Sequence, residues 1–302
     1  MDMQFYSNGK LFILGEYYVL EGAKVFALPT KFGQYLRVFP IKNSVISWKS
    51  YDADGSVWYN DEIEIKDIIA NKNQSADKVR NTLITILHEA HLMNLNILSS
   101  GGFIAETELT FPRNWGLGTS STLINNIAQW FEINAYELLQ KSFGGSGYDI
   151  ACAQNNVPVT YQMQNGKPIV KQVIFNPVFK EHIYFVYLNQ KRDSKEAIAN
   201  FRKKQKDLTN EIAEVSRMTG ELLQIQDLET FITFFKRYEQ NLSAVLETPT
   251  IQQQLFPDFN GLVKSLGGWG GDFVMVASQE NPIEYFKNKG FDTVLSYEEM
   301  IL

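Results

Sequence analysis

The chain has 302 residues, of which 44% are hydrophobic and 13% aromatic, so it is long enough to bury one large core or two smaller ones. Its formal net charge of -6 argues against nucleic-acid or anionic-membrane partners, although a local cationic pocket for an anionic small molecule stays open. The single cysteine, Cys152, excludes an intrachain disulfide and a cysteine-based zinc cluster. The sequence opens without a signal-peptide pattern, and no window reaches the roughly 18 apolar residues of a membrane span, so we expect a soluble, cytoplasmic protein.

The first part of the chain is predicted to be mainly β-structure. Apolar alternation typical of strands occurs over the ranges 10–20, 27–39, 44–60 and 103–111. The first range is an apolar, β-rich run that Gly15 and Glu16 interrupt, and we expect it to form a strand. The third contains an Asp-Gly turn, which predicts a hairpin. Helical spacing of apolar residues over 75–96 predicts a helix before the strand at 103–111.

A glycine- and hydroxyl-rich stretch, NWGLGTSSTL at residues 114–123, directly precedes an apolar helical pattern. A helix N-terminus offers unpaired backbone N–H groups and a partial positive charge, and glycines let an anion approach closely. An ordinary loop with an N-cap is the alternative, because Ser and Thr are frequent caps. The order strand, loop, helix favours a phosphate site.

The second half is predicted to combine strands with packed helices. A further Gly- and Ser-rich loop at 143–154 enters an apolar segment, and a third glycine-rich loop at 264–278 leads into an apolar strand. Strand patterns cover VTYQM and HIYFVYL, and a charged helical pattern covers 195–247, with breaks at Gly220 and near Asp227. We expect a domain boundary within 155–165, giving domains 1–160 and 161–302.

Two common phosphate-binding motifs are absent. Neither Gly-Lys pair, at Lys10 and Lys167, is followed by the Ser or Thr that a Walker A loop requires. Gly116 and Gly118 begin as a dinucleotide motif does, but Ser121 stands where its third glycine belongs. A different phosphate-binding fold is therefore needed.

The three glycine-rich motifs resemble, in order, those of the GHMP kinase superfamily, which includes galactokinase, homoserine kinase, mevalonate kinase and phosphomevalonate kinase. They read NGKLFILGEYYVLEG, GLGTSST and LGGWGGDF, and GGSGYD between the last two matches the stretch with the family's catalytic aspartate. The resemblance spans Gly9 to about Ala277. It implies an α+β, two-domain kinase with an N-terminal β-rich nucleotide-binding domain, a C-terminal α/β domain, a cleft between them and a left-handed βαβ crossover.

The resemblance also implies site residues. Asp149 matches the aspartate that accepts or orients the substrate hydroxyl, Lys10 the lysine beside it, and Ser120 the serine that reaches Mg²⁺ and the ATP phosphates. The ATP-phosphate loop would comprise Gly116, Leu117, Gly118, Thr119, Ser120 and Ser121. Substrate contacts would come from Lys10, Glu16, Tyr17, Gly268, Gly270, Gly271 and Asp272.

Several positions keep a second interpretation or depart from the family. From the residues alone, Asp149 is also typical of a helix cap, and Glu16 of a polar residue with a buried partner. Trp115 and Trp269 replace small residues, either as core packing or as walls of the site. Asn8 replaces a proline and Tyr17 a histidine of some members, while Glu137 is an unplaced candidate for a second Mg²⁺ ligand.

The predicted function is ATP- and Mg²⁺-dependent phosphorylation of a small anionic metabolite, either mevalonate or 5-phosphomevalonate. The Gly-Glu-Tyr and Gly-Gly-Asp sequences are closer to phosphomevalonate kinase, whereas the length and the Ser-rich second motif also suit mevalonate kinase. A lyase similar to diphosphomevalonate decarboxylase and a non-catalytic sensor are the alternatives. A homodimer is compatible with these features.

Overall fold

Two compact units make up the chain in the computed structural model, which describes residues 2–190, 201, 207–269 and 271–302. Unit 1 comprises Met1–Lys10, Phe32–Arg113 and Leu117–Gln154. Unit 2 comprises Leu11–Lys31, Asn114–Gly116 and Asn155–Leu302. Strands β1 (Met3–Leu14) and β2 (Val25–Ile41) each contribute residues to both units. The predicted division of the chain at residue 160 stays a prediction.

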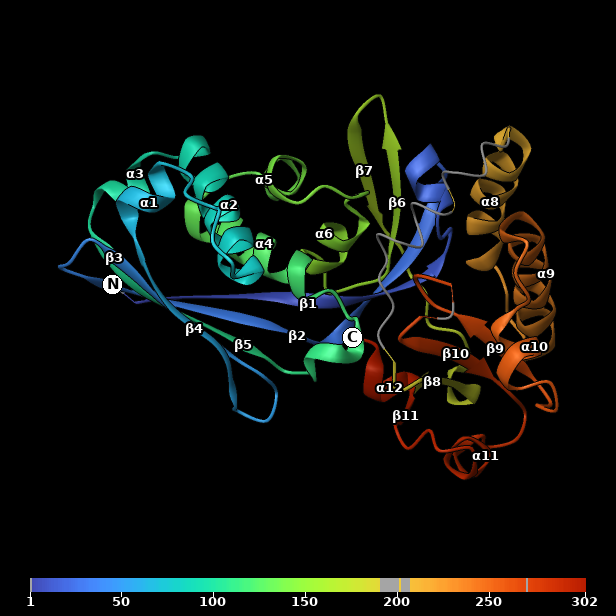
Figure 1. Cartoon of the computed structure of the whole chain (residues 1–302). Helices are drawn as coiled ribbons and strands as arrows, with labels where there is room; N and C mark the ends of the chain where they lie inside the picture. The colour runs from blue at the N-terminus through green and yellow to red at the C-terminus, as the bar shows by residue number, and fades with distance from the viewer. Residues whose placement is uncertain (1, 191–200, 202–206, 270) are drawn as a thin grey trace. The chain divides into compact units, whose positions relative to one another are not determined.

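The strands of unit 1 form a mixed sheet in the order β4-β3-β5-β2 (Figure 1). Its strands are the later part of β2 with β3 (Val45–Tyr51), β4 (Val57–Glu64) and β5 (Gly102–Leu109), and β1 also pairs with β2. Strand β5 runs antiparallel to β2 and parallel to β3, while β3 and β4 form the predicted hairpin. Alternation sets the faces of the strands: Leu36 and Val38 are buried, whereas Arg37 between them pairs with Glu108 across the strands.

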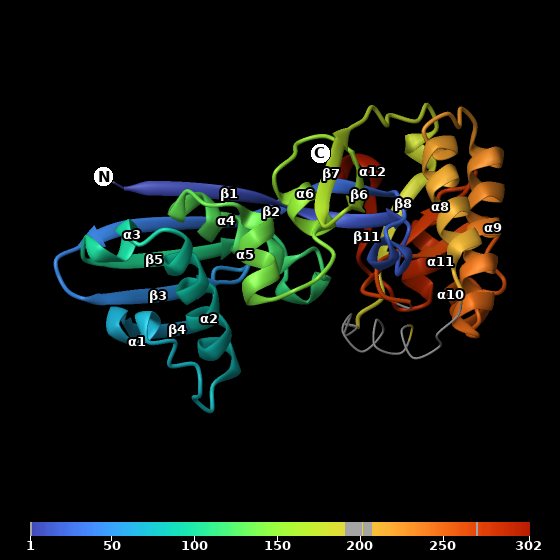
Figure 2. The same ribbon diagram turned by 90° about the horizontal axis from the view of Figure 1, so that it is seen from above.

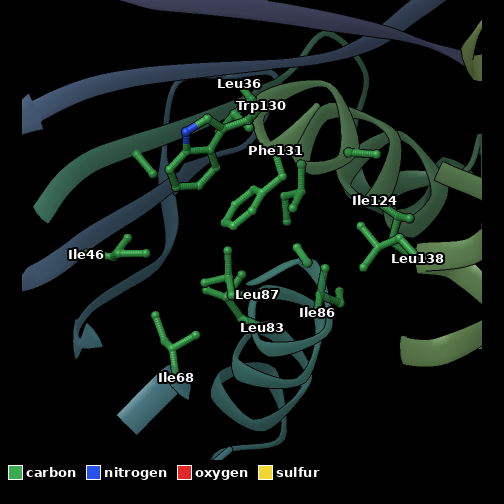
Figure 3. Packing of buried hydrophobic residues seen from close by; sticks show 14 of the residues in the cluster. Leu36, Ile46, Ile68, Leu83, Ile86, Leu87, Ile124, Trp130, Phe131 and Leu138 are labelled. Atoms are coloured by element: carbon green, nitrogen blue, oxygen red, sulfur yellow. The ribbon is translucent and has the colours of Figure 1, made fainter. Parts of the chain in front are cut away.

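Helices cover one face of this sheet (Figure 1). They are α1 (Ile65–Ile69), α2 (Lys78–Met93), α3 (Asn96–Ser99), α4 (Thr119–Phe131), α5 (Ala135–Ser142) and α6 (Tyr148–Ala153). In Figure 3, Leu83 and Leu87 of α2 point toward Phe131 of α4, and Ile46 comes from the sheet. Burial of this apolar cluster holds α4 in place, because its apolar positions recur at helical spacing on one face.

Unit 2 contains two groups of strands and a set of helices. The early part of β2 pairs with β6 (Val159–Gln164), which pairs with β7 (Lys167–Gln172). An antiparallel sheet has the order β11-β8-β10-β9, formed by β8 (Ile183–Tyr187), β9 (Leu262–Ser265), β10 (Phe273–Ala277) and β11 (Val294–Ser296). The helices are α8 (Thr209–Leu222), α9 (Leu228–Leu246), α10 (Ile251–Leu255), α11 (Ile283–Asn288) and α12 (Tyr297–Met300).

Helices α8 and α9 lie side by side in both views (Figure 1 and Figure 2). In the ranges that the structure describes, no helix has both the length and the apolar character needed to cross a membrane.

Most of the predicted elements are confirmed, and two details are wrong. Residues after the Gly15 break form a 3-10 helix, Tyr18–Glu21, rather than a strand, because Gly15 and Tyr17 both have positive φ and turn the chain. Gly220 does not break a helix but lies inside α8, where the buried residues around it outweigh the cost of a helical glycine. Part of the predicted helical range, 195–200 and 202–206, lies outside the described residues.

Candidate active site

The predicted phosphate loop has two left-handed glycines before helix α4. Gly116 has φ +67° and Gly118, the N-cap of the helix, has φ +99°, a region that other residues rarely adopt. No side chain in the described part of the chain caps α4. The first-turn N–H groups of this 13-residue helix therefore have no side-chain acceptor in the cap and are available to an anion.

The hydroxyl groups of this loop have different roles. Ser120 is exposed in the first turn of α4. The buried Ser121 hydroxyl donates to the Gly118 carbonyl at 2.8 Å, and the Thr122 hydroxyl donates to Oε1 of Gln34 at 2.7 Å. Ser120 is thus open to a ligand, whereas Ser121 and Thr122 brace the loop from within.

Lys10 of β1 is built into the same loop. Its backbone N–H donates to the carbonyl of Leu117 at 2.9 Å. A Cβ added to Gly118 would lie 3.3 Å from Cγ of Lys10 and 2.8 Å from Oγ of Ser121. The glycine is therefore required by its φ, and a Cβ there would also crowd the Ser121 hydroxyl and, less closely, the Lys10 side chain. Two motifs far apart in the sequence meet here within unit 1.

Asp149 lies in the first turn of α6, after the left-handed Gly147. The ammonium group of Lys10 lies 5.8 Å from the ring centre of the neighbouring Tyr148. Oδ1 of Asp149 is buried and has no hydrogen-bond partner among the residues that the structure describes. A buried carboxylate oxygen without a partner is costly, so this atom is suited to a proton donor from a ligand.

Cys152, on α6, lies close enough to both Asp149 and Lys10 for each of them to affect the pKa of its thiol. Burial raises the pKa of its thiol; the nearby Asp149 carboxylate raises it further, and the Lys10 ammonium lowers it. Both charged groups therefore act on the same turn of α6. The thiol itself is fully buried, so Cys152 serves as a small packed residue.

The remaining predicted site residues belong to unit 2. The Asp272 side chain packs against Gly116, and a Cβ at Gly116 would overlap its carboxylate. A Cβ at Gly271 would lie 2.5 Å from the Leu266 carbonyl and 2.7 Å from that of Gly268, so the third glycine-rich loop folds tightly on itself. Gly270 lies outside the described residues.

Tyr17 contacts the third loop from the first motif. Its hydroxyl accepts a hydrogen bond from the backbone N–H of Trp269 at 2.9 Å, and its side chain is buried. The Trp269 indole donates to the Pro249 carbonyl. Trp115 packs edge-on against Phe273, with ring centres 5.4 Å apart. Both tryptophans thus take part in packing within unit 2.

Glu16 lies in a buried charge network. Its Oε1 binds the ammonium group of Lys264 at 2.6 Å, and its Oε2 accepts from the Tyr238 hydroxyl at 2.6 Å. Both carboxylate oxygens have partners inside unit 2, which is the arrangement expected of a structural residue. Lys264 is fully buried and also lies 3.7 Å from Oε1 of Glu239.

Glu239 is the weakly bound member of this network. Its Oε2 accepts a long hydrogen bond of 3.3 Å from the Ser265 N–H, and its Oε1 has no hydrogen-bond partner in the described residues. Burial raises the pKa of Glu239 to about 7, against which the Lys264 ammonium lowers it. One lysine cannot neutralise two buried carboxylates, so Glu239 holds the proton near neutral pH.

Three members of this network were not predicted from the sequence: Lys264, Glu239 and Tyr238. A lysine inside the apolar strand β9 was the available signal, because a buried lysine requires an acidic partner. The partner itself could not be identified, since Glu16 lies 248 positions away. Glu137, the unplaced candidate for a metal ligand, is exposed in the first turn of α5.

No protein-family model matches the chain, and no curated protein matches it in sequence. Solved structures of small-molecule kinases, however, match it over nearly its whole length. The chain has the mixed α/β, two-domain fold of the GHMP kinase superfamily, which confirms the fold predicted from the three motifs.

Three neighbours illustrate the range of this fold. Mevalonate kinase from Methanococcus jannaschii has a TM-score of 0.71 and 16% identity, with 98% of this chain and 97% of that chain covered. Phosphomevalonate kinase from Streptococcus pneumoniae, in complex with phosphomevalonate and AMPPNP, has a TM-score of 0.68 and 16% identity, with 95% of each chain covered. Galactokinase from Lactococcus lactis, complexed with galactose, has a TM-score of 0.67 and 14% identity, covering 95% of this chain and 88% of that chain.

Proposed function

We propose that the chain is an ATP-dependent kinase that phosphorylates an oxygen of a small anionic metabolite. The observation that supports this most directly is that Oδ1 of Asp149 is buried and has no partner in the described residues. Asp149 directly follows Tyr148, whose ring the Lys10 ammonium approaches. A substrate hydroxyl would supply the missing hydrogen bond. The uncapped start of α4, to which Lys10 is attached through Leu117, would receive the phosphates.

The residues divide the chemistry of phosphoryl transfer among them. Asp149 would accept the proton of the substrate hydroxyl while the hydroxyl oxygen forms a bond to the γ-phosphorus of ATP. The bond between that phosphorus and the β–γ bridging oxygen breaks, and ADP leaves. Lys10 would stabilise the negative charge that develops on the attacking oxygen. The N–H groups of Thr119, Ser120 and Ser121 would hold phosphate oxygens, because they point out of the helix start.

The site also fits Mg²⁺. Ser120 is exposed and follows the two left-handed glycines, Gly116 and Gly118, in sequence. Mg²⁺ prefers oxygen ligands from one or two side chains together with phosphates. Ser120 would hold the ion, which would neutralise phosphate charge when bound. The described residues include no group of three or more His, Cys, Asp or Glu side chains placed to hold a metal.

For the substrate, we propose mevalonate or 5-phosphomevalonate. Solved neighbours include kinases of both names, and the Gly-Glu-Tyr and Gly-Gly-Asp sequences are closer to the second. We further propose a cytoplasmic enzyme. Homodimer formation stays a prediction that light scattering of the purified protein tests.

A screen for ADP release tests the proposal. Purified protein with MgATP is offered mevalonate, 5-phosphomevalonate, 5-diphosphomevalonate, homoserine and galactose in separate reactions. ADP release with either of the first two supports the proposal. ADP together with carbon dioxide from 5-diphosphomevalonate would instead support the lyase. Tight AMPPNP binding with no ADP release from any compound would support the sensor.

A further inference from the structure

A series of side-chain hydrogen bonds runs through unit 1, buried except at its Gln154 end. Nε2 of Gln154 donates to Oδ1 of Asn125 at 3.0 Å, and Nδ2 of Asn125 donates to Oγ of Ser7 at 2.8 Å. Oγ of Ser7 donates in turn to Oδ1 of Asn126 at 2.7 Å. The last bond of the series runs from Nδ2 of Asn126, which donates to the backbone carbonyl of Gln34 at 2.9 Å.

The direction of these bonds is fixed by the donors available. Ser7 has one hydroxyl proton and gives it to Asn126, so its oxygen accepts from Asn125. The Asn125 amide is then oriented with its oxygen toward Gln154. Ser7 and Asn125 are buried, and a buried amide that loses a partner is strongly disfavoured. This series of hydrogen bonds therefore has one arrangement in which every side chain keeps its partner.

Asn125 joins the three segments that contain the predicted reacting groups. It lies on α4, which begins at the phosphate loop and contains Ser120. Ser7 lies on β1, the strand that contains Lys10. Gln154 is the C-cap of α6, the helix that contains Asp149.

We propose that Asn125 is a positioning residue, which sets the registry of Lys10 and Asp149 relative to the phosphate loop through its bonds to Ser7 and Gln154. This inference rests on the proposed kinase function. Its physical basis is that apolar packing is non-directional and leaves a six-residue helix free to shift, whereas a hydrogen bond fixes direction and distance. Phosphoryl transfer is sensitive to such shifts, because a misplacement of about 1 Å can lower the rate about 100-fold.

The Gln154→Met variant tests the link between α4 and α6. Gln154 is exposed, so the substitution removes one hydrogen bond without opening the core. Gln172→Met is the matched control, because exposed Gln172 on β7 likewise donates one side-chain bond, to Asn155 at 2.7 Å. We expect kcat of Gln154→Met to fall about tenfold with an unchanged KM for MgATP, and the control to match the wild type.

Hydrogen exchange separates this inference from the proposed function. We expect amides of residues 148–153 to exchange about fivefold faster in Gln154→Met than in the control, the factor expected for one lost hydrogen bond. Faster exchange with a wild type that turns over no substrate would contradict the kinase proposal while supporting the link. Unchanged exchange and unchanged kcat would overturn the positioning role, and so would equal falls in both variants.

Discussion

The buried carboxylate of Glu239 makes stability depend on pH in a way that a single substitution should remove. Its ordinary pKa of 4.5 is raised to about 7 by burial. Between these two values the folded protein keeps a proton that the unfolded chain has lost. The stability from this group is therefore complete below about pH 4.5 and is lost as the pH rises through about 7.

The size of the effect follows from the same two values. Each unit of pKa difference corresponds to about 1.4 kcal/mol, so the folded state loses on the order of 3 kcal/mol relative to a neutral side chain by about pH 8. Glu239→Gln is isosteric and cannot ionise. We expect it to exceed the wild type by less than about 1 kcal/mol near pH 5 and by about 3 kcal/mol near pH 8.

Urea unfolding followed by tryptophan fluorescence, repeated between about pH 5 and pH 8, measures the difference. Glu298→Gln is the control, because the Glu298 side chain is 71% exposed in its ion pair with Lys180. We expect the control to follow the wild type at every pH. Parallel curves for the wild type and Glu239→Gln would refute the reasoning, since they would mean that Glu239 is ionised in the core throughout.

Three further predictions concern the phosphate loop and the proposed base. Gly118→Ala should weaken AMPPNP binding in calorimetry, because its Cβ would crowd Ser121 and Lys10, whereas Gly166→Ala, also left-handed at φ +73° but with open space around it, should not. Ser120→Ala should lower kcat/KM for MgATP about tenfold, and unchanged kinetics would remove Ser120 from the site. Asp149→Asn should lower kcat by about 10² to 10⁴ while AMPPNP still binds, and near-normal turnover would exclude Asp149 as the base.

Local features of the fold were predictable because their causes are local. The hairpin of β3 and β4 follows from its Asp-Gly turn and alternating residues, and α4 from its apolar face after a glycine loop. The exception is the segment after Gly15, where positive φ at Tyr17 overrides an apolar pattern. Strand propensity is weak against such a turn.

The candidate site was predictable only through its glycine motifs. Gly118 signals an unusual backbone by its residue type, and the structure places it against Lys10. The residues that hold the motifs in place gave weaker signals, because their partners are distant in sequence. Asn125 and Ser7 lie 118 positions apart, and neither is unusual in its local context. Pairing of this kind depends on the tertiary fold.

Phosphorus NMR follows the transferred group directly. Purified protein is incubated with MgATP and either mevalonate or 5-phosphomevalonate, with Asp149→Asn in parallel. We expect the γ-phosphate resonance of ATP to decline in step with a new phosphomonoester from mevalonate, or a new diphosphate from 5-phosphomevalonate, and Asp149→Asn to produce neither on that timescale. Inorganic phosphate as the only product, or unchanged ATP with both compounds, would contradict phosphoryl transfer to these substrates.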